Sequence, residues 1–91
     1  MIKLHLHFAL ADYPHIRVKA GEELGHLYSD DNNLTELNEA AVSIGMSERW
    51  IQNESAGIIH YDVWRSPLKR AKGLFKIADD RTFVADMKPG A

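Results

Sequence analysis

The chain has 91 residues, of which 45% are hydrophobic and 26% are charged, and it contains no cysteine. This length and composition predict one small globular domain over residues 1–91, and the lack of cysteine excludes disulfides, Cys-ligated zinc, iron–sulfur clusters and thiol catalysis. No apolar run approaches the ~18 residues of a membrane span, and the start lacks the pattern of a secretory signal. We therefore expect a cytoplasmic protein with no membrane partner.

Charge is distributed unevenly along the chain, whose formal net charge is −2 at pH 7. Residues 21–62 carry nine acidic side chains against one basic, whereas residues 63–91 carry seven basic against three acidic. An acidic domain is a poor candidate for binding duplex DNA, because that binding depends on many Lys and Arg contacts to phosphate. A core this small is also compatible with a homo-oligomer.

A strand is predicted at the start of the chain. Residues 2–10 alternate between apolar and polar side chains, which is typical of a half-buried strand. Residues 11–25 contain proline and glycine turn formers and indicate a loop, and residues 26–30 predict a second strand. The buried face of the first strand is expected to comprise Ile2, Leu4, Leu6, Phe8 and Leu10.

The next segment predicts a helix with well-defined ends. Asn33 and Glu36 have the spacing of a capping box. An apolar stripe with helical period runs over residues 34–44, and Gly45 supplies the left-handed residue that ends a helix.

The second half of the chain alternates short strands and helices. Residues 58–64 are rich in β-branched and aromatic residues and predict a strand, with His60 and Asp62 on one face and Tyr61 on the other. Ser66-Pro67 has the pattern of a helix N-cap followed by proline at the first helical position. The other expected elements are a brief strand at 50–52, a polar loop at 53–57, a helix over 67–74, a strand at 75–78 and a last helix that Asp79 or Asp80 caps and Pro89-Gly90 ends.

These elements predict an α+β fold in a single small domain. We expect a sheet covered mainly on one side, by two or three helices. The sheet comprises residues near 2–10, 26–29, 58–64 and 75–78, and the covering helices are those at 34–44 and 67–74.

Paired imidazole and carboxylate groups are the first candidates for chemistry. His60 and Asp62 are expected to share a strand face, where the imidazole can act as a general acid or base that the carboxylate orients. His26 and Asp30 repeat this pattern on another predicted strand. If the two strands are neighbours, all four groups converge as catalytic or metal-binding residues. A purely structural His–Asp pair is the alternative.

A second histidine pattern lies on the first strand. His5 and His7 have the i, i+2 spacing that places two imidazoles on one face and offers two ligands to zinc. His15, His26 or His60 would supply a third nitrogen. The polar face of an amphipathic strand explains the same pair without a metal.

The order and spacing of several short sequence motifs resemble a known family. The pattern runs from HLYSD at residues 26–30, through a leucine-bearing helix that ends in Ile44-Gly45, to WIQ at 50–52 and HYDV at 60–63, and closes with a Ser-x-x-Lys-Arg-Ala helix start. Over residues 24–84 the chain is similar to the bacterial and phage family called domain of unknown function 4031. The resemblance implies that the family's recurring polar and aromatic positions fall on His26, Asp30, Trp50, Gln52, His60, Tyr61, Asp62, Lys69 and Arg70.

The first functional hypothesis is the binding of a small polar ligand, such as a nucleotide or another phosphorylated metabolite. Trp50 would stack on the ligand, and Lys69 and Arg70, at the start of a helix, would hold its anionic group. The alternatives are that Trp50 is a core residue and that Lys69 and Arg70 belong to a solvated basic helix face. The expected ligand-binding residues are Trp50, Gln52, Tyr61, Lys69 and Arg70.

Two further hypotheses belong to other classes of protein. The second is a small hydrolase or nuclease in which His60 or His26 is the general acid or base and Asp30 or Asp62 orients it or holds a divalent ion. The third is a phage-type inhibitor that binds a host protein through a charge-segregated surface.

Overall fold

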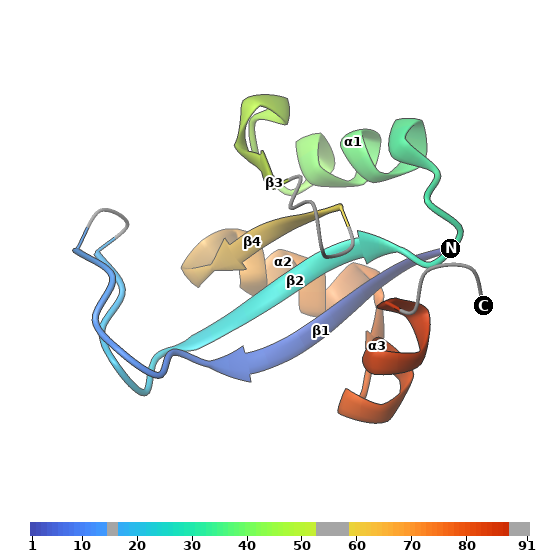
Figure 1. Ribbon diagram of the computed structural model, residues 1–91. Helices are drawn as coiled ribbons and strands as arrows, with labels where there is room; N and C mark the ends of the chain where they lie inside the picture. Colours follow the sequence, from blue (N-terminus) through green and yellow to red (C-terminus); the bar gives the residue numbers. More distant parts are fainter. Residues whose placement is uncertain (15–16, 53–58, 88–91) are drawn as a thin grey trace.

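A mixed β-sheet organises the part of the chain that the computed structural model describes, namely residues 1–14, 17–52 and 59–87 (Figure 1). The strand order is β3-β4-β2-β1-β5. β1 pairs antiparallel with β2 and parallel with β5, while β4 pairs antiparallel with both β2 and β3. The α+β prediction is confirmed. The strands are β1 (Ile2–Phe8), β2 (Glu23–Ser29), β3 (Ile51–Gln52), β4 (His60–Trp64) and β5 (Lys76–Ala78).

Two helices, α1 (Leu34–Ser43) and α2 (Arg65–Leu74), cover one face of the sheet and form the main core with it. This is the one-sided covering that the apolar patterns predicted. The face is apolar because alternate residues of each strand point the same way. The core joins Leu4, Leu27, Tyr61 and Val63 of the sheet to Leu37, Ala41, Leu68 and Ala71 of the helices.

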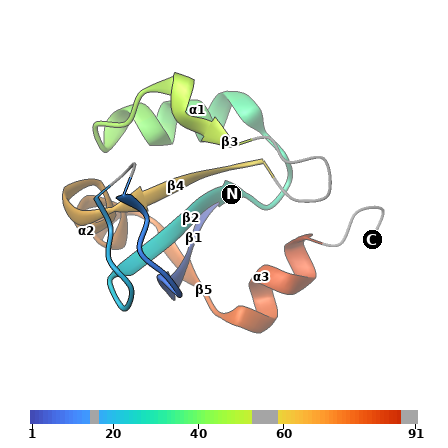
Figure 2. The same cartoon turned by 60° about the vertical axis from the view of Figure 1, so that its left-hand side comes forward.

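The third helix, α3 (Asp80–Met87), lies on the opposite side of the sheet from α1 (Figure 2). Its Phe83 is buried in a second, smaller cluster with Tyr28 and Ala78. α3 contacts β5, and its side chains also reach His5 of β1 and the β2 residues Tyr28 and His26.

Local sequence signals set the ends of two helices. The side-chain oxygen of Asn33 accepts a hydrogen bond from the backbone N–H of Glu36 at 3.1 Å, and Gly45 has a φ of 90°, so both predicted ends of α1 are confirmed. Asp79 caps α3 by accepting a hydrogen bond from Thr82 N–H at 2.7 Å.

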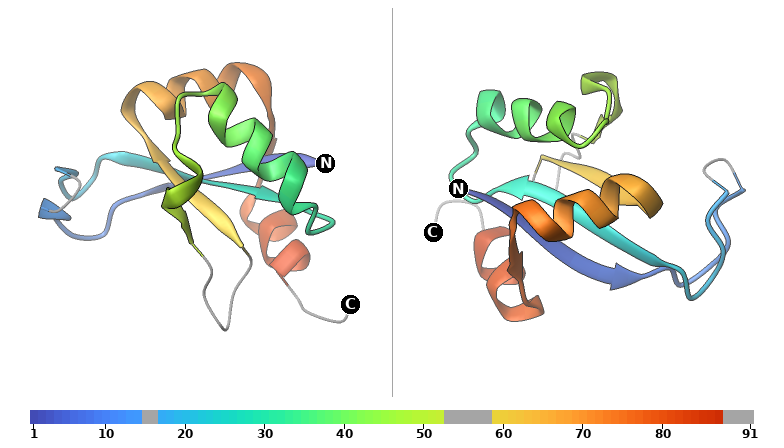
Figure 3. Two further views of the ribbon diagram at one scale, coloured as in Figure 1. Left: turned by 90° about the horizontal axis from the view of Figure 1, so that it is seen from above. Right: turned by 180° about the vertical axis from the view of Figure 1, so that it is seen from behind.

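The expectation that Phe8 and Leu10 are buried is wrong. Phe8 is 62% exposed and Leu10 is 94% exposed. Beyond Leu6 the chain runs out into a protruding hairpin arm, which is closed by a bridge between Tyr13 and Val18 and which neither α1 nor α2 covers (Figure 3). The apolar alternation therefore continues past the edge of the core.

The start of the second strand also differs from the prediction, because β2 begins at Glu23 inside the expected loop. Gly25 is a strand residue here, paired with Leu6 and Val63. A Cβ at this position would lie 2.8 Å from Leu4 Cδ1 and 2.9 Å from Leu68 Cδ1, so the glycine lets the core side chains approach the backbone.

The predicted cap of α2 is wrong. The helix begins at Arg65, its N-cap is Trp64, and no side chain caps it, so Ser66 lies within the first turn. β4 therefore passes directly into α2, and Arg65 adopts a φ of 54° at the junction. His15, Ile58, the loop predicted at 53–57 and Pro89-Gly90 lie outside the described residues.

Candidate metal centre

Three neighbouring strands bring histidines together on the sheet face opposite α1 and α2. His5 of β1 is paired with His26 of β2, and His26 is paired with Asp62 of β4. His7 and His60 lie two residues from these positions and therefore share the same face. The sequence alternation and the strand order together produce a band of imidazoles across β1, β2 and β4.

The side chains of His26, His60 and Asp62 converge. One ligand atom from each lies within 4.8 Å of the corresponding atoms of the other two. His60 Nε2 is 3.2 Å from Asp62 Oδ1, and the rings of His26 and His60 stack with centroids 4.6 Å apart. The two strands are neighbours, which was the condition for the convergence of the four groups, and their pairing brings three of those groups together.

Burial and charge set the protonation of these groups. The hydrogen bond from His60, together with the nearby imidazoles, lowers the pKa of Asp62. Burial, followed by the neighbouring His60 and His7, lowers the pKa of His26 to about 4. At neutral pH Asp62 is therefore ionised, and His26 is neutral with a nitrogen lone pair available.

Two imidazole nitrogens and one carboxylate oxygen form a donor set typical of first-row transition metals. In a tetrahedral centre with bonds of about 2.1 Å, ligand atoms lie roughly 3.4 Å apart. The three ligand atoms lie within 4.8 Å of one another, so the widest separation that this allows is about 1.4 Å greater than in such a centre. The Asp62 side chain is 43% exposed, so the set is open to solvent on one side.

His5 and His7 lie next to this set but differ in their surroundings. His5 is buried under α3, where its ring stacks on Phe83 with centroids 4.0 Å apart and its Nε2 lies 2.8 Å from Asp80 Oδ1. His7 is only partly buried, and its ring centroid lies 4.5 Å from that of His26. Burial, followed by the charge of His5, lowers the pKa of His7.

Asp30 does not join the histidines. Its Oδ1 lies 2.9 Å from the amino group of Met1, and its Oδ2 lies 3.2 Å from Lys3 Nζ. The hydrogen bond from the amino terminus is the largest cause of the lowered pKa of Asp30. Asp30 follows the end of β2, and four residues of strand correspond to roughly 13 Å, so it lies at the far end of the face from His26.

Three of the predicted ligand-binding residues lie on the helical side of the sheet. Tyr61 is fully buried there, and its hydroxyl donates to Asn38 Oδ1 at 2.5 Å. Arg70 donates from Nη1 to the carbonyl oxygen of Ile44 at 2.9 Å, at the carboxyl end of α1. Lys69 is exposed on α2, so the sheet separates all three from the candidate metal centre.

Trp50 and Gln52 lie near the β3 edge. Trp50 is in the 3-10 helix η2 (Glu48–Trp50) and is about half exposed. The backbone of Gln52 pairs with that of His60. The ring centroid of Phe83 in α3 lies 5.5 Å from that of His26, and no local signal in the sequence indicates this contact.

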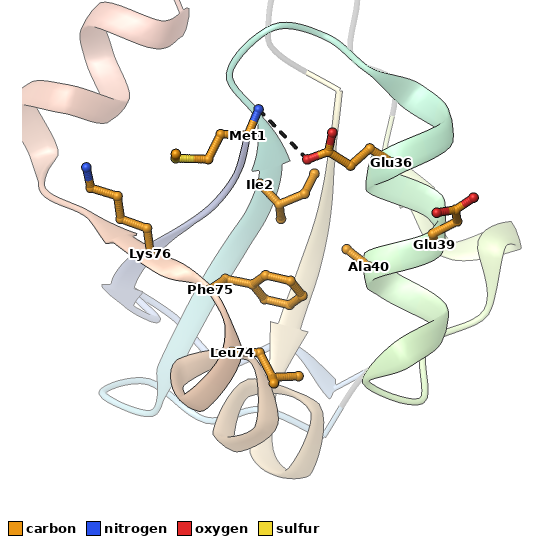
Figure 4. A pocket seen from close by; sticks show the side chains of 8 residues that line it. All are labelled: Met1, Ile2, Glu36, Glu39, Ala40, Leu74, Phe75 and Lys76. Carbon is orange, nitrogen blue, oxygen red and sulfur yellow. Dashed lines mark ion pairs between the residues drawn. The ribbon is translucent and has the colours of Figure 1, made fainter.

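A separate hollow of about 540 Å³ lies between α1 and the segment that joins α2 to β5 (Figure 4). Glu36 and Glu39 line one side, and Phe75 and Lys76 line the other. It contains none of the residues predicted to bind a ligand, and it is on the helical side of the sheet.

The family comparison agrees with the sequence motifs. A family model described as "Protein of unknown function (DUF4031)" matches residues 9–75. The chain belongs to this family. The DUF4031 match includes His26, His60 and Asp62, whereas His5, His7 and α3 lie outside it. No curated protein and no solved structure shows significant similarity to the chain. None of the helices in the described ranges has the length and apolar character needed to cross a bilayer.

Proposed function

We propose that this protein binds a divalent transition-metal ion through His26, His60 and Asp62, and that the bound ion holds a small anionic ligand such as the phosphate group of a nucleotide or metabolite. The observation that carries the proposal is the convergence of the three ligand atoms within 4.8 Å. They come from two paired strands, which is a rigid support for a metal site.

The donor types indicate the class of ion. Imidazole nitrogen suits zinc, cobalt, nickel and copper, whereas magnesium and calcium favour sites made of oxygen ligands. With two imidazoles and one carboxylate, the set favours an ion of the zinc or cobalt type.

The charge and the exposure of the site favour an anionic ligand. One carboxylate and two neutral imidazoles leave a divalent ion with one net positive charge. Three protein ligands with an open fourth position are also the pattern of zinc sites that bind water or substrate. The ion would thus hold the anionic group for which the sequence had suggested Lys69 and Arg70.

Hydrolysis is a second candidate function, favoured by the exposed side of Asp62. Water bound at an open position of zinc has a pKa of about 7 and is a nucleophile at neutral pH. A zinc- or cobalt-loaded sample that cleaves p-nitrophenyl phosphate, with activity lost in Asp62→Asn, would support a hydrolase. Intact substrate after long incubation would exclude hydrolysis of this substrate, and anion binding would remain as the proposed function.

Metal binding itself is tested by calorimetric titration of chelator-treated protein with zinc or cobalt. We expect one ion per chain in the wild type, and an affinity at least about tenfold weaker in His26→Asn and Asp62→Asn. Asp12→Asn is the matched control, because Asp12 is an exposed loop carboxylate. Absence of uptake by the wild type, or equal affinities for Asp62→Asn and Asp12→Asn, would refute the proposal.

A further inference from the structure

His7 occupies a distinctive place beside the candidate metal centre. It comes from β1, the third strand of the histidine band, and its ring centroid is 4.5 Å from that of His26 in an edge-to-face arrangement. It remains partly accessible to solvent, whereas His60 is buried. An imidazole that is partly accessible to solvent therefore lies next to the candidate metal centre.

The geometry places His7 beside the ligand set and not within it. The mutually close ligand atoms in the described residues belong to His26, His60 and Asp62. His5, the other histidine of β1, is held away from the centre by Asp80 and by the stack on Phe83. His7 is thus the histidine of β1 that can reach a molecule bound at the open position.

We infer that His7 contacts the anion held by the metal ion, donating a ring N–H hydrogen bond to one of its oxygens. This inference rests on the proposed function and assigns the ligand-recognising residue of the same site. The ion fixes one oxygen of the anion, and His7 fixes a second, so the pair selects anions with at least two oxygens, such as phosphate groups. Hydrogen bonds to an ionised acceptor are the stronger kind, so the contact has a measurable effect on affinity.

The test uses cobalt as the metal and inorganic phosphate as the anion, because the visible spectrum of bound cobalt reports on its coordination. Wild type, His7→Phe and His7→Gln are each titrated with cobalt and then with phosphate. We expect the cobalt affinity to stay within about threefold in both variants, since neither changes a metal ligand. We expect phosphate affinity to fall about tenfold or more in His7→Phe and to be largely retained in His7→Gln, whose amide keeps an N–H donor.

The outcomes separate this inference from the proposed function. If the wild type takes up no cobalt, the metal centre itself is refuted. If cobalt binds but phosphate does not, metal binding stands and the anion contact is refuted. A large loss of cobalt affinity in His7→Phe would make His7 a metal ligand and overturn the inference, as would equal phosphate affinities for the wild type and His7→Phe. Phosphate affinity that falls equally in His7→Gln and His7→Phe would also overturn it, since the loss would then not follow the N–H donor.

Discussion

His26 is surrounded on the sheet face by other titratable groups, with His7 and His60 as the closest rings. Burial and these two imidazoles both disfavour its protonated form, and Asp62 offsets part of that effect. A lone imidazole on a solvated strand would have a pKa near 6.5. The lowered pKa is therefore a property of the cluster, and it links the candidate centre to the stability of the fold.

In metal-free protein, the free energy of unfolding should fall as the pH is lowered from about 6.5 to about 4. In this window the unfolded chain takes up a proton on His26 that the folded protein does not, because the folded pKa is about 4 and the unfolded value is 6.5. Above pH 6.5 His26 is neutral in both states, so its titration takes nothing from the free energy of unfolding. Within the window, the uptake of one proton changes this free energy by at most about 1.4 kcal/mol per pH unit. His26→Gln should flatten this part of a stability curve measured by urea unfolding. An unchanged slope would show that His26 titrates normally in the fold.

α3 is attached to the sheet through polar contacts as well as through Phe83. The buried Tyr28 of β2 donates its hydroxyl to Asp86 Oδ2 at 2.6 Å, and Lys3 Nζ approaches the same oxygen at 3.0 Å. Burial, followed by this hydrogen bond, raises the pKa of Tyr28, so the phenol stays protonated and remains a donor. Because α3 is short, these contacts decide where it lies.

Tyr28→Phe should therefore destabilise the protein more than Tyr61→Phe does. Both tyrosines are fully buried and both lose one hydroxyl, but Tyr28 donates to a carboxylate whereas Tyr61 donates to the Asn38 amide. We expect losses of about 1.5–3 kcal/mol for Tyr28→Phe and about 0.5–1.5 kcal/mol for Tyr61→Phe in urea unfolding. The reverse order would mean that the Asp86 contact does not anchor α3.

The molecule as a whole has two different faces on one sheet. α1 and α2 bury the apolar face, and the opposite face carries the histidine band next to α3. The candidate metal ligands come from β2 and β4, which are separated in the chain by α1, η2 and β3. An ion bound there would join two distant segments of the sequence and so stabilise the entire fold.

Metal should raise the stability of the whole domain by mass action. At a free zinc concentration a hundred times the dissociation constant, the free energy of unfolding should increase by about 2.7 kcal/mol over the chelator-treated state. Thermal unfolding with zinc and with chelator measures this shift. In Asp62→Asn, whose affinity should be at least about tenfold weaker, the increase at the same zinc concentration should fall to about 1.4 kcal/mol or less. It should persist in Asp12→Asn, and a shift of equal size in both variants would indicate non-specific binding.

Local patterns in the chain were sufficient for most of the architecture. The capping residue Asn33 and the terminating Gly45 define α1, because these interactions form within a few residues of one another. Strand alternation was enough to put His60 and Asp62 on one face and Tyr61 on the other, because the side-chain period of a strand is two. Alternation could not show where the helices stop covering β1, and for that reason Phe8 and Leu10 were misplaced.

Residue types and spacing alone thus determined the α+β class, the apolar face of the sheet and the choice of His26, His60 and Asp62 as chemically interesting groups. Tertiary structure decided which of these groups meet. The pairing of β2 with β4 joined the two histidines to Asp62, and the pairing of β1 with β2 placed Asp30 beside the amino terminus. The packing of α2 on the apolar face placed Lys69 and Arg70 across the sheet. Strand order depends on contacts between residues far apart in the chain, and no local pattern encodes those contacts.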